Sequence, residues 1–417
     1  MKTIKIVHVV PLFPSKSETF IINHIVESLD YGFGSIILTD KKIPLYNSSQ
    51  EDILEKHHLY KSAKETKYNI PENKLFRILK AIWLLLINFS NATIFFKTLN
   101  ITKYKERGKS LKLWFLVARF LQFKNNKLFH AHFGVNGVLL AEMKELGAIR
   151  GDILVSFYGY DTFSTLETRE NLKKTYAVLF KFASILLVSS KYLKKNLLLL
   201  NAPINKIELN YVGVNIDLFP FVKSKSKEVF DIITVGRLIN LKGQKFGIKV
   251  LKELVDKNYN VHYHIVGDGD QKQYLDKLSK ELNISKYVSM YGALSQGKIK
   301  RLLNSSDLFL MTSITDVDGR AEGQGLVIAE AKATGLPVIA FNSGGIKETI
   351  LDDITGFLVP EKDIDTMVYK TESLINDFEL REKVGIEGRI FIEKEFNSKL
   401  QSMKIIKLYQ SLLVKNK

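Results

Sequence analysis

The stretch AEGQGLVIAEA at residues 321–331 sets two carboxylates, Glu322 and Glu330, eight positions apart around two glycines. Gly323 and Gly325 leave backbone N–H groups open just before a helix, and a helix start attracts anions. Glu322 lies in the loop, whereas Glu330 lies roughly two turns inside the helix, where its carboxylate can accept from two hydroxyls. The alternative is a capped helix with an outward acid, but this helix is mostly apolar and carboxylates are seldom buried there unpartnered.

Short apolar strands alternate with helical segments on both sides of this stretch, from residue 230 to residue 359. Such alternation predicts a parallel sheet covered by helices on both faces, which is a doubly wound domain. We expect strands at 230–235, 262–266, 288–291, 308–312, 337–341 and 357–359, and helices at 243–257, 271–282, 296–305, 326–333 and 346–350.

A similar alternation occupies the first half of the chain, and a polar linker at 221–228 separates the two halves. Two such domains facing each other form a cleft, and ligands bind these sheets beyond the carboxyl ends of the strands. After residue 363 we expect helices rich in lysine and glutamate. In the first half we expect strands at 4–10, 35–38, 128–132, 153–157, 185–189 and 207–211, and helices beginning near 17–19 and spanning 137–146 and 172–182.

Positive charge follows the first strand of the second domain, where GRLINLKG at 236–243 carries Arg237 and Lys242. Arginine grips phosphate oxygens in a bidentate manner, and lysine adds a compact charge. Cations are disfavoured at a helix start, so the pair predicts a diphosphate site, with two surface cations as the alternative. Backbone groups that a ligand can approach closely are expected at Gly267, Gly292 and Leu294.

Ordered motifs continue along the second domain: GRL and KG within 236–243, GDG at 267–269, Glu-x7-Glu at 322–330, GLPVIA at 335–340, GGIKE at 344–348 and GFLV at 356–359. In this order they resemble a family 4 glycosyltransferase of the GT-B fold. The resemblance covers nearly all of the second domain. It implies a nucleotide-diphosphate-sugar donor, UDP-linked by preference, and retention of configuration at the anomeric carbon.

The resemblance also implies an architecture and residue roles. Residues 1–210 would form a Rossmann-like acceptor domain and residues 211–397 a Rossmann-like nucleotide-sugar domain. A C-terminal helix at about 398–417 would pack back on the first domain. Arg237 and Lys242 would hold the diphosphate, Glu322 the donor sugar and Glu330 the ribose, with further donor contacts from Gly323, Gln324, Gly325 and Leu326.

The loop after the first strand reads PLFPSKSETFI at 11–21, where many relatives carry two glycines. This version resembles the subgroup that builds bacterial exopolysaccharide, capsule and O-antigen. Ser17 can cap the following helix, whose N–H groups would point at the donor phosphates, and Glu18 is expected at the cleft.

Two histidines end a strand of the first domain, in HAHFG at 130–134. On the alternation of strand side chains we expect His132 to face the cleft, as a catalytic residue, and His130 to face away. A hydrogen-bonded structural histidine is the alternative for His132. A zinc pair is not expected, because side chains on opposite faces do not share an ion easily.

The loop SFYGYD at 156–161 holds Tyr158 where relatives usually have a histidine. Tyr158 is expected to hydrogen-bond a sugar hydroxyl, and Asp161 either to bind hydroxyls or to cap the following helix. The acidic triplet DVD at 316–318 looks like a metal motif of a different glycosyltransferase fold. Since Arg237 and Lys242 already supply positive charge, we predict no required metal and no cofactor beyond the nucleotide-sugar substrate.

Basic charge is concentrated in one stretch of the 417-residue chain, which carries a net charge of +17 and no cysteine. Residues 61–127 contain 15 basic and 3 acidic side chains among many apolar ones. Such a stretch predicts either an anionic membrane surface or solvated lysines beside core helices. No nucleic-acid-binding module is recognisable, so nucleic acid ranks last among the partners.

The first strand follows the start of the chain without a signal peptide, and the apolar run at 81–96 is shorter than a membrane span. We therefore expect a cytoplasmic glycosyltransferase, attached to the inner face of the plasma membrane. Its acceptor would be a saccharide linked to polyprenyl diphosphate. A GT-B-like UDP-sugar 2-epimerase and a non-catalytic scaffold with a decayed site are the alternatives.

Overall fold

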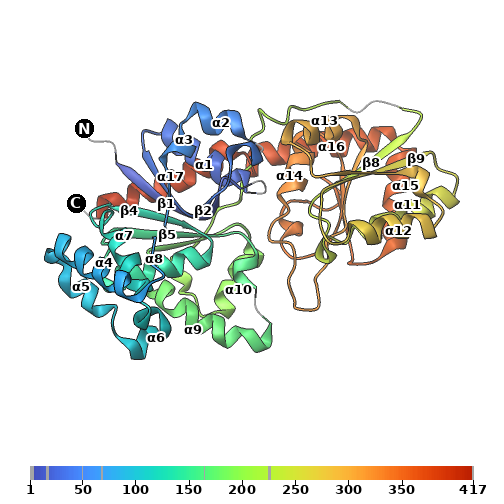
Figure 1. Ribbon diagram of the computed structural model, residues 1–417. Helices are drawn as coiled ribbons and strands as arrows, with labels where there is room; N and C mark the ends of the chain where they lie inside the picture. Colours follow the sequence, from blue (N-terminus) through green and yellow to red (C-terminus); the bar gives the residue numbers. More distant parts are fainter. Residues whose placement is uncertain are drawn as a thin grey trace.

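The computed structural model of the protein describes residues 4–15, 18–48, 50–66, 69–163, 165–223 and 227–415. Within these residues the chain forms two lobes, each built on one parallel sheet with helices on its faces (Figure 1). The expected pair of doubly wound domains is therefore confirmed.

The first sheet has the strand order β3-β2-β1-β4-β5-β6-β7, with parallel neighbours throughout. The order reverses between β1 and β4, and ligands bind such sheets at the reversal, outside the carboxyl ends of the strands. Its strands are β1 (Lys5–Phe13), β2 (Gly34–Lys42), β3 (Ala63–Glu65), β4 (Leu128–His132), β5 (Asp152–Phe157), β6 (Ile185–Val188) and β7 (Ile207–Leu209). The helices beside it include α1 (Thr19–Asp30), α8 (Gly134–Leu146), α9 (Leu166–Phe182) and α10 (Lys191–Leu199).

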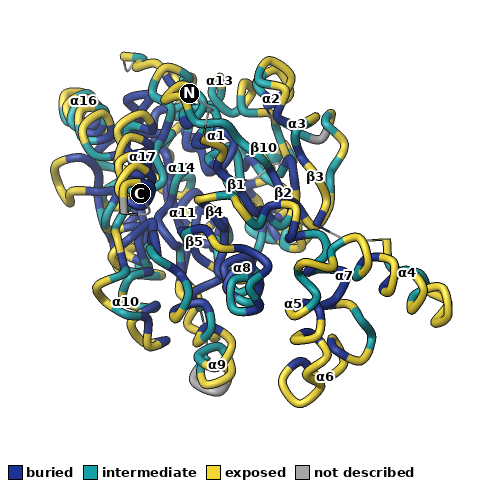
Figure 2. The backbone as a smooth tube through the Cα atoms, turned by 90° about the vertical axis from the view of Figure 1, so that its left-hand side faces the viewer, coloured by how far each residue is buried: buried dark blue, intermediate teal, exposed yellow. Residues whose placement is uncertain are grey.

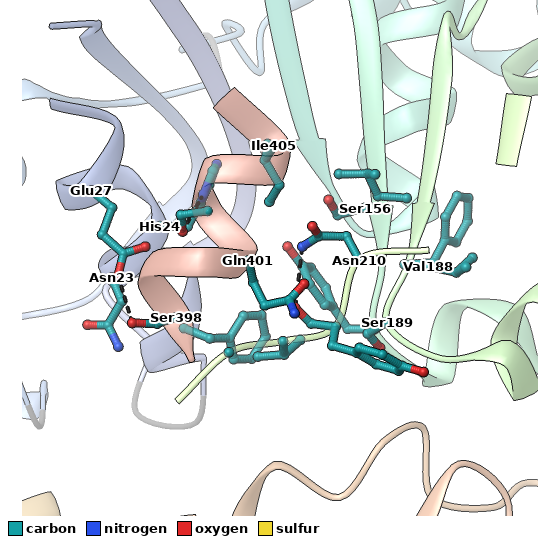
Figure 3. Close-up of a pocket in the computed structure, with 18 residues that line it drawn as sticks. Asn23, His24, Glu27, Ser156, Val188, Ser189, Asn210, Ser398, Gln401 and Ile405 are labelled. Atoms are coloured by element: carbon teal, nitrogen blue, oxygen red, sulfur yellow. Dashed lines mark hydrogen bonds between the residues drawn. The ribbon is translucent and has the colours of Figure 1, made fainter. Parts of the chain in front are cut away.

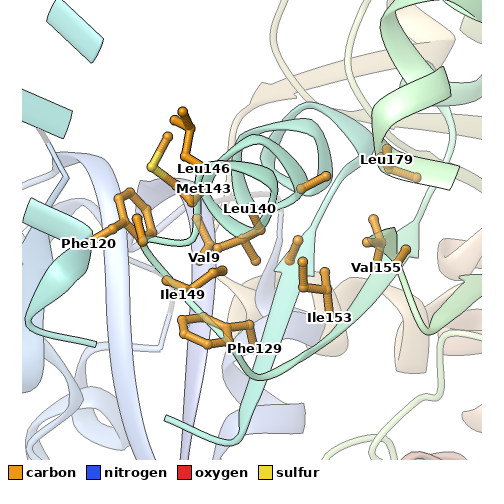
Figure 4. Close-up of a cluster of buried hydrophobic side chains, with 14 of the residues drawn as sticks. Val9, Phe120, Phe129, Leu140, Met143, Leu146, Ile149, Ile153, Val155 and Leu179 are labelled. Carbon is orange, nitrogen blue, oxygen red and sulfur yellow. The ribbon is translucent and has the colours of Figure 1, made fainter. Parts of the chain in front are cut away.

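The core of the first domain lies between its central strands and α8. Leu140 and Met143 of α8 are fully buried, and they belong to one apolar cluster with Phe129 of β4 and Ile153 of β5 (Figure 4). Strands covered on both faces are expected to be nearly continuous apolar runs; β5 follows this pattern, whereas β4 is equally buried but carries two histidines. The core thereby holds the ends of β4 and β5 in place, and both ends carry predicted site residues.

The second sheet has the order β10-β9-β8-β11-β12-β13, again parallel throughout. Its strands are β8 (Phe230–Val235), β9 (Val261–Val266), β10 (Val288–Gly292), β11 (Leu308–Met311), β12 (Val338–Phe341) and β13 (Phe357–Val359). Its helices are α11 (Gln244–Asp256), α12 (Lys272–Glu281), α13 (Gln296–Ser305), α14 (Leu326–Ala333), α15 (Ile364–Asn376) and α16 (Phe378–Glu395), with short 3₁₀ turns η5 (Asn240–Lys242) and η7 (Ile346–Glu348).

The C-terminal helix α17 (Ser398–Lys415) returns from the second domain and packs on the first, as expected (Figure 1). Ile406 and Tyr409 of α17 share an apolar cluster with Ile6 of β1 and Leu128 of β4. The chain therefore passes between the domains twice. A bridge between Val214 and Asn397 holds the two passages together.

The basic stretch at 61–127 forms β3 and a group of helices at one end of the first domain. The separate helices were not assigned from the sequence. The edge strand β3 was not assigned either, because its three residues are too few to show alternation. Trp114 Nε1 donates to the Ala81 carbonyl at 3.1 Å, which ties α4 to α7. The group comprises α4 (Lys74–Ile87), α5 (Ala92–Lys97), α6 (Ile101–Lys109) and α7 (Lys112–Leu121), and α2 (Glu51–Lys56) and α3 (Leu59–Ser62) precede it.

Much of α4 is exposed, and this helix projects from the body of the domain (Figure 2). Among the described residues, no single helix has the length and apolar composition of a membrane span. The helical segments Lys74–Ile87 and Phe89–Lys97 reach these values only when taken together, and they meet at 95°.

Candidate active site between the two domains

The loops after β8, β9 and β10 lie next to one another at the predicted donor site. Gly236 N–H donates to the Val266 carbonyl, and Gly267 N–H donates to the Gly292 carbonyl, both at 2.9 Å. Gly267 has a φ of 147°, and a Cβ at this position would collide with the Gly236 carbonyl oxygen. Glycine is required for this close approach. Leu294 packs partly buried against the core beside these loops.

Lys242 and Glu322 form an ion pair, and each side chain is only 16% exposed. The structure thus brings Lys242, predicted to hold the diphosphate, to Glu322, predicted to hold the donor sugar. Because the pair is shielded from water, removing one partner would leave an uncompensated charge. A diphosphate oxygen entering the site would provide the ammonium with a second anionic partner.

Arg237 is exposed on the loop after β8, and its guanidinium makes no hydrogen bond or ion pair with any described residue. Its charge acts on Glu18, which precedes α1 in the other domain. Burial raises the pKa of Glu18 to about 7, and the Ser15 hydrogen bond and the Arg237 charge offset part of this rise. A cation of the second domain therefore faces an acid of the first. Ser17 lies outside the described residues.

Glu330 lies in the second turn of α14, and its carboxylate has no hydrogen-bond or ion-pair partner within the described ranges. Burial raises its pKa to about 7. A shielded carboxylate without partners is costly, and such groups concentrate at functional sites. Glu330 is thus available to accept from a pair of hydroxyls, which is the role predicted for it.

The glycine-rich loop before α14 also touches the first domain. A Cβ at Gly323 would lie 2.6 Å from the Tyr158 carbonyl oxygen, so only glycine allows this approach. Gly325 is the N-cap of α14, with a φ of 85°, and Leu326 begins the helix.

Gln324 has a different partner from the one predicted. Its amide accepts from Val212 N–H at 2.7 Å and donates to the Val212 carbonyl at 2.8 Å. Both ends of the amide are therefore taken up by the backbone of Val212, where the chain first passes between the domains, and the contact of Gln324 with a donor stays a prediction.

The loop after β5 differs from what the sequence predicted. Asp161 accepts from the backbone N–H groups of Gly134 (2.9 Å), Gly159 (3.1 Å) and Tyr158 (3.3 Å). It therefore caps the start of α8 and its own loop rather than the helix that follows. Burial raises the pKa of Asp161 to about 6, although these N–H groups lower it in part. The Tyr158 hydroxyl is already hydrogen-bonded to His132 Nδ1, at 2.8 Å.

The expected orientation of the two histidines of β4 was wrong. Strand side chains alternate with a period of two, so residues 130 and 132 lie on the same face. The rings of His130 and His132 stack 4.2 Å apart, and both are fully buried. His132 thus lies inside the first domain, where burial and the neighbouring histidines keep its pKa well below the usual value. The structure favours the structural alternative for His132.

Four buried histidines form one group, which we call the histidine cluster: His8, His24, His130 and His132. His8 Nδ1 lies 3.3 Å from His132 Nε2, and the Tyr409 hydroxyl of α17 lies 2.5 Å from His130 Nδ1 and 2.8 Å from His24 Nε2. His8 and His24 were not predicted as members of a site. A histidine within the apolar run IVHVV was the available signal.

Ring nitrogens of His8, His130 and His132 lie within 4.8 Å of one another, a spacing that a metal ion can use. His130 and His132 therefore lie close enough to share an ion, contrary to the expectation that they face opposite sides of the strand. The second nitrogen of His130 is also engaged, because Nε2 lies 2.7 Å from the Ser156 hydroxyl. Since its nitrogens pair with Tyr409 and Ser156, this imidazole is satisfied by the protein. That no metal is required stays a prediction.

The acidic triplet at 316–318 forms a turn closed by Arg320. Asp316 accepts from Arg320 Nε at 2.7 Å and from the N–H groups of Asp318 and Arg320. Asp318 pairs with the same guanidinium at 3.2 Å. Both carboxylates thus have partners within the loop.

A small cavity of about 40 Å³, lined by polar and apolar side chains, lies between α1, α17 and the ends of β5 and β6 (Figure 3). Glu27 Oε2, Ser189 Oγ and Asn210 Oδ1 have no hydrogen-bond partner among the described residues, although all three side chains line this cavity. The volume suits a few water molecules rather than a sugar ring. Arg237 and Lys242 do not line it, so it is separate from the predicted donor site.

Comparison with known proteins finds a family and several relatives that match the chain. Residues 215–391 match the family described as glycosyl transferases group 1. The chain is 28% identical over 412 residues to the putative colanic acid biosynthesis glycosyltransferase WcaL of Escherichia coli K12, covering 96% of this chain and 98% of that one. It is 27% identical over 408 residues to the amylovoran biosynthesis glycosyltransferase AmsK of Erwinia amylovora, with the same coverage.

The structure is also similar to solved structures over nearly its whole length. It matches Anabaena Alr3699/HepE in complex with UDP with a TM-score of 0.74 at 18% identity, covering 98% of this chain and 100% of that one. A glycosyltransferase from Rickettsia africae gives a TM-score of 0.71 at 21% identity, covering 99% of each chain. The protein has the GT-B fold. It is a glycosyltransferase, and its second domain belongs to the glycosyl transferases group 1 family.

We predict that the histidine cluster makes the protein acid-sensitive. The pKa of His24 is lowered to about 4 and that of His8 well below 6.5, chiefly by burial. The unfolded chain therefore takes up more protons below pH 6.5, and stability falls as the pH drops. For His24 this loss amounts to about 1.4 kcal/mol at about pH 5.5. In thermal melts, His8→Leu should show a smaller loss of melting temperature between neutral and acid pH, whereas His57→Gln should not. An equal loss of melting temperature between neutral and acid pH in the wild type and both variants would contradict this.

A second prediction concerns Glu330, whose folded pKa lies above its unfolded value. The folded state retains the proton between about pH 4.5 and 7, so stability decreases as the pH rises through this window. Glu330→Gln should therefore raise the melting temperature by about 2 °C near pH 8, with no gain near pH 4.5. The exposed helical Glu253→Gln is the control. A Glu330→Gln melt that matches the wild type at both pH values would refute the account.

Proposed function

We propose that this glycosyltransferase moves a sugar from a nucleoside-diphosphate sugar, a UDP-sugar first, onto a saccharide carried by polyprenyl diphosphate. The transfer would retain the anomeric configuration and serve bacterial surface polysaccharide assembly. The observation that carries the proposal is that Arg237, Lys242 and Glu330 lie in one parallel-sheet domain, on the loop after β8 and on α14, and that Glu330 has no partner among the described residues. The names of WcaL and AmsK, and the UDP and UDP-glucose complexes of HepE, support it.

The proposed sugar transfer depends on the positive charges of Arg237 and Lys242 beside the leaving group. The bond between the anomeric carbon and the phosphate oxygen breaks, and the nucleoside diphosphate leaves with the electron pair. Arg237 and Lys242 stabilise the negative charge that develops on the leaving group. The acceptor oxygen forms the new bond on the same face of the sugar, and its proton passes to the departing phosphate oxygen.

The neighbouring acids would orient the donor. Glu330 accepts from the ribose hydroxyls, and Glu322 shares Lys242 with the diphosphate while accepting from a sugar hydroxyl. Glu18 approaches from the first domain, opposite Arg237. Both domains must therefore be close together for turnover, which also excludes water from the reacting carbon.

A membrane-facing surface would bring the enzyme to a lipid-linked acceptor. The outer face of α4 is apolar, although it is exposed; Trp83 is 53% and Leu86 64% exposed. Lys74 and Arg77 on the same helix add positive charge. Apolar side chains beside cations suit an anionic lipid surface. The exposed apolar residues of α4 and the turn after it, which we call the α4 face, are Leu75, Phe76, Ile78, Leu79, Ile82, Trp83, Leu86, Ile87 and Phe89.

The donor site is tested by turnover with a panel of nucleotide sugars. Arg237→Ala and Lys242→Ala should each lower kcat more than about tenfold, because each removes a cation from the leaving group. Lys249→Ala, an exposed cation on α11, should leave kcat unchanged, and EDTA should not abolish activity. Near-normal turnover in both site variants would refute the assignment. Conversion of the free nucleotide sugar without an acceptor would instead indicate an epimerase.

The membrane surface is tested by flotation with phosphatidylcholine vesicles, with and without phosphatidylglycerol. The wild type should float with the anionic vesicles at low salt. Replacing Trp83 and Leu86 by serine should reduce binding about tenfold or more, since two exposed apolar anchors are lost. Tyr369→Ser changes an exposed aromatic residue of the second domain and should bind normally. Equal binding by both variants, or none by the wild type, would remove the proposal.

A further inference from the structure

A glutamate of the second domain caps a helix of the first. Glu348 ends η7 and lies in the GGIKE motif, to which the sequence analysis gave no individual role. Glu348 Oε2 accepts from Lys191 N–H at 2.8 Å, and Oε1 accepts from Tyr192 N–H at 3.0 Å. Lys191 and Tyr192 are the first residues of α10. The carboxylate therefore holds the N-terminus of this helix from the opposite domain.

The electrostatics of this contact favour its formation. The first N–H groups of a helix have no partner within the helix, and its dipole attracts negative charge there. The hydroxyl of Ser190, the N-cap, accepts from Leu193 N–H at 3.1 Å. Glu348 satisfies the preceding two, and the Tyr211 hydroxyl donates a third hydrogen bond to it at 3.2 Å. Burial, and then the Glu348 charge, raise the pKa of Tyr211 to about 12, so this hydroxyl stays a donor.

The segment that carries Glu348 is also attached to the donor site. Gly345 N–H donates to the Glu322 carbonyl at 2.8 Å. A Cβ at Gly345 would collide with the Gly323 carbonyl and would lie 3.1 Å from the Ser190 hydroxyl. The backbone of Glu322, which pairs with Lys242, is thus held against the turn that leads to Glu348. A movement of α10 away from Glu348 would be transmitted through this turn to the loop of Glu322.

We propose that Glu348 is a positioning residue that couples approach of the two domains to assembly of the donor site. The inference rests on the proposed function only for what the site binds. When the domains meet, the α10 N-terminus receives its carboxylate cap, and the turn at 344–348 holds Glu322 where it pairs with Lys242. When the domains separate, the helix start and the carboxylate must both be hydrated again. The donor then encounters a site whose Glu322 loop lacks this support.

The experiment uses the absence of cysteine from the chain. Lys174→Cys and Lys277→Cys, both exposed and one in each domain, allow a donor and an acceptor dye to report interdomain distance. In this labelled protein, Glu348→Gln should shift the population towards lower transfer efficiency without any ligand. Glu361→Gln is the matched control. Glu361 also accepts from a backbone N–H and a hydroxyl, both of Thr315, but within one domain.

Kinetics supply the second readout. Glu348→Gln should raise the donor KM roughly tenfold, with a smaller effect on kcat, because only a fraction of the protein is competent to bind. Tyr211→Phe removes one of the three hydrogen bonds and should give a smaller change in the same direction. Thermal melts show whether each variant is folded.

The outcomes separate the two proposals. A shift in transfer efficiency for Glu348→Gln, absent in Glu361→Gln, together with the raised KM, supports the positioning role. If the folded Glu348→Gln variant has unchanged transfer efficiency, the positioning role is overturned, even if its donor KM is raised. Because the dye measurement needs no substrate, it can succeed even if no nucleotide sugar is turned over. In that case the proposed function fails and the mechanical coupling stands.

Discussion

Backbone contact between two parallel-sheet domains is the constraint on which the site depends. Gly323 approaches the Tyr158 carbonyl so closely that no side chain fits, and Gly345 is enclosed in the same way by Gly323 and Ser190. These contacts bring together loops that follow strands of both sheets, since parallel strands present their carboxyl ends on one edge. The glycines of the second domain thus allow the domains to meet, and the polar side chains beside them gain partners across the boundary.

The charged side chains at this boundary are only partly paired with one another. Lys242 already has Glu322, Arg237 acts on Glu18 from a distance, and Glu330 has no partner within the described chain. Such an arrangement lowers the stability of the protein alone, because shielded carboxylates prefer partners. A ligand with two phosphates and several hydroxyls would complete it. Burial raises the pKa values of both Glu18 and Glu330, and only at Glu18 do neighbouring groups offset part of the rise.

Much of this could be predicted from the sequence. Residues 230–235, 296–305, 326–333 and 357–359 were assigned with the observed bounds, because periodicity and glycines mark the turns of doubly wound domains. Contacts between distant segments could not be predicted. The histidine cluster assembles from β1, α1 and β4, and is hydrogen-bonded to Tyr409 of α17, while Glu348 meets α10 across 157 positions. His132 was misplaced because a period of two was misapplied to residues two apart. The pairing of Gln324 with the Val212 backbone could not be predicted either, because Val212 is remote in the sequence.

The central claim is that Arg237, Lys242 and Glu330 form one nucleoside-diphosphate site. The most direct measurement is a thermal-shift titration of the wild type and the Arg237→Ala variant with UDP, GDP and ADP. A ligand that binds the folded state raises the melting temperature by mass action. The account predicts a selective shift with one nucleotide, UDP first, that is lost in the variant. No shift with any nucleotide, or an equal shift in both proteins, would contradict it.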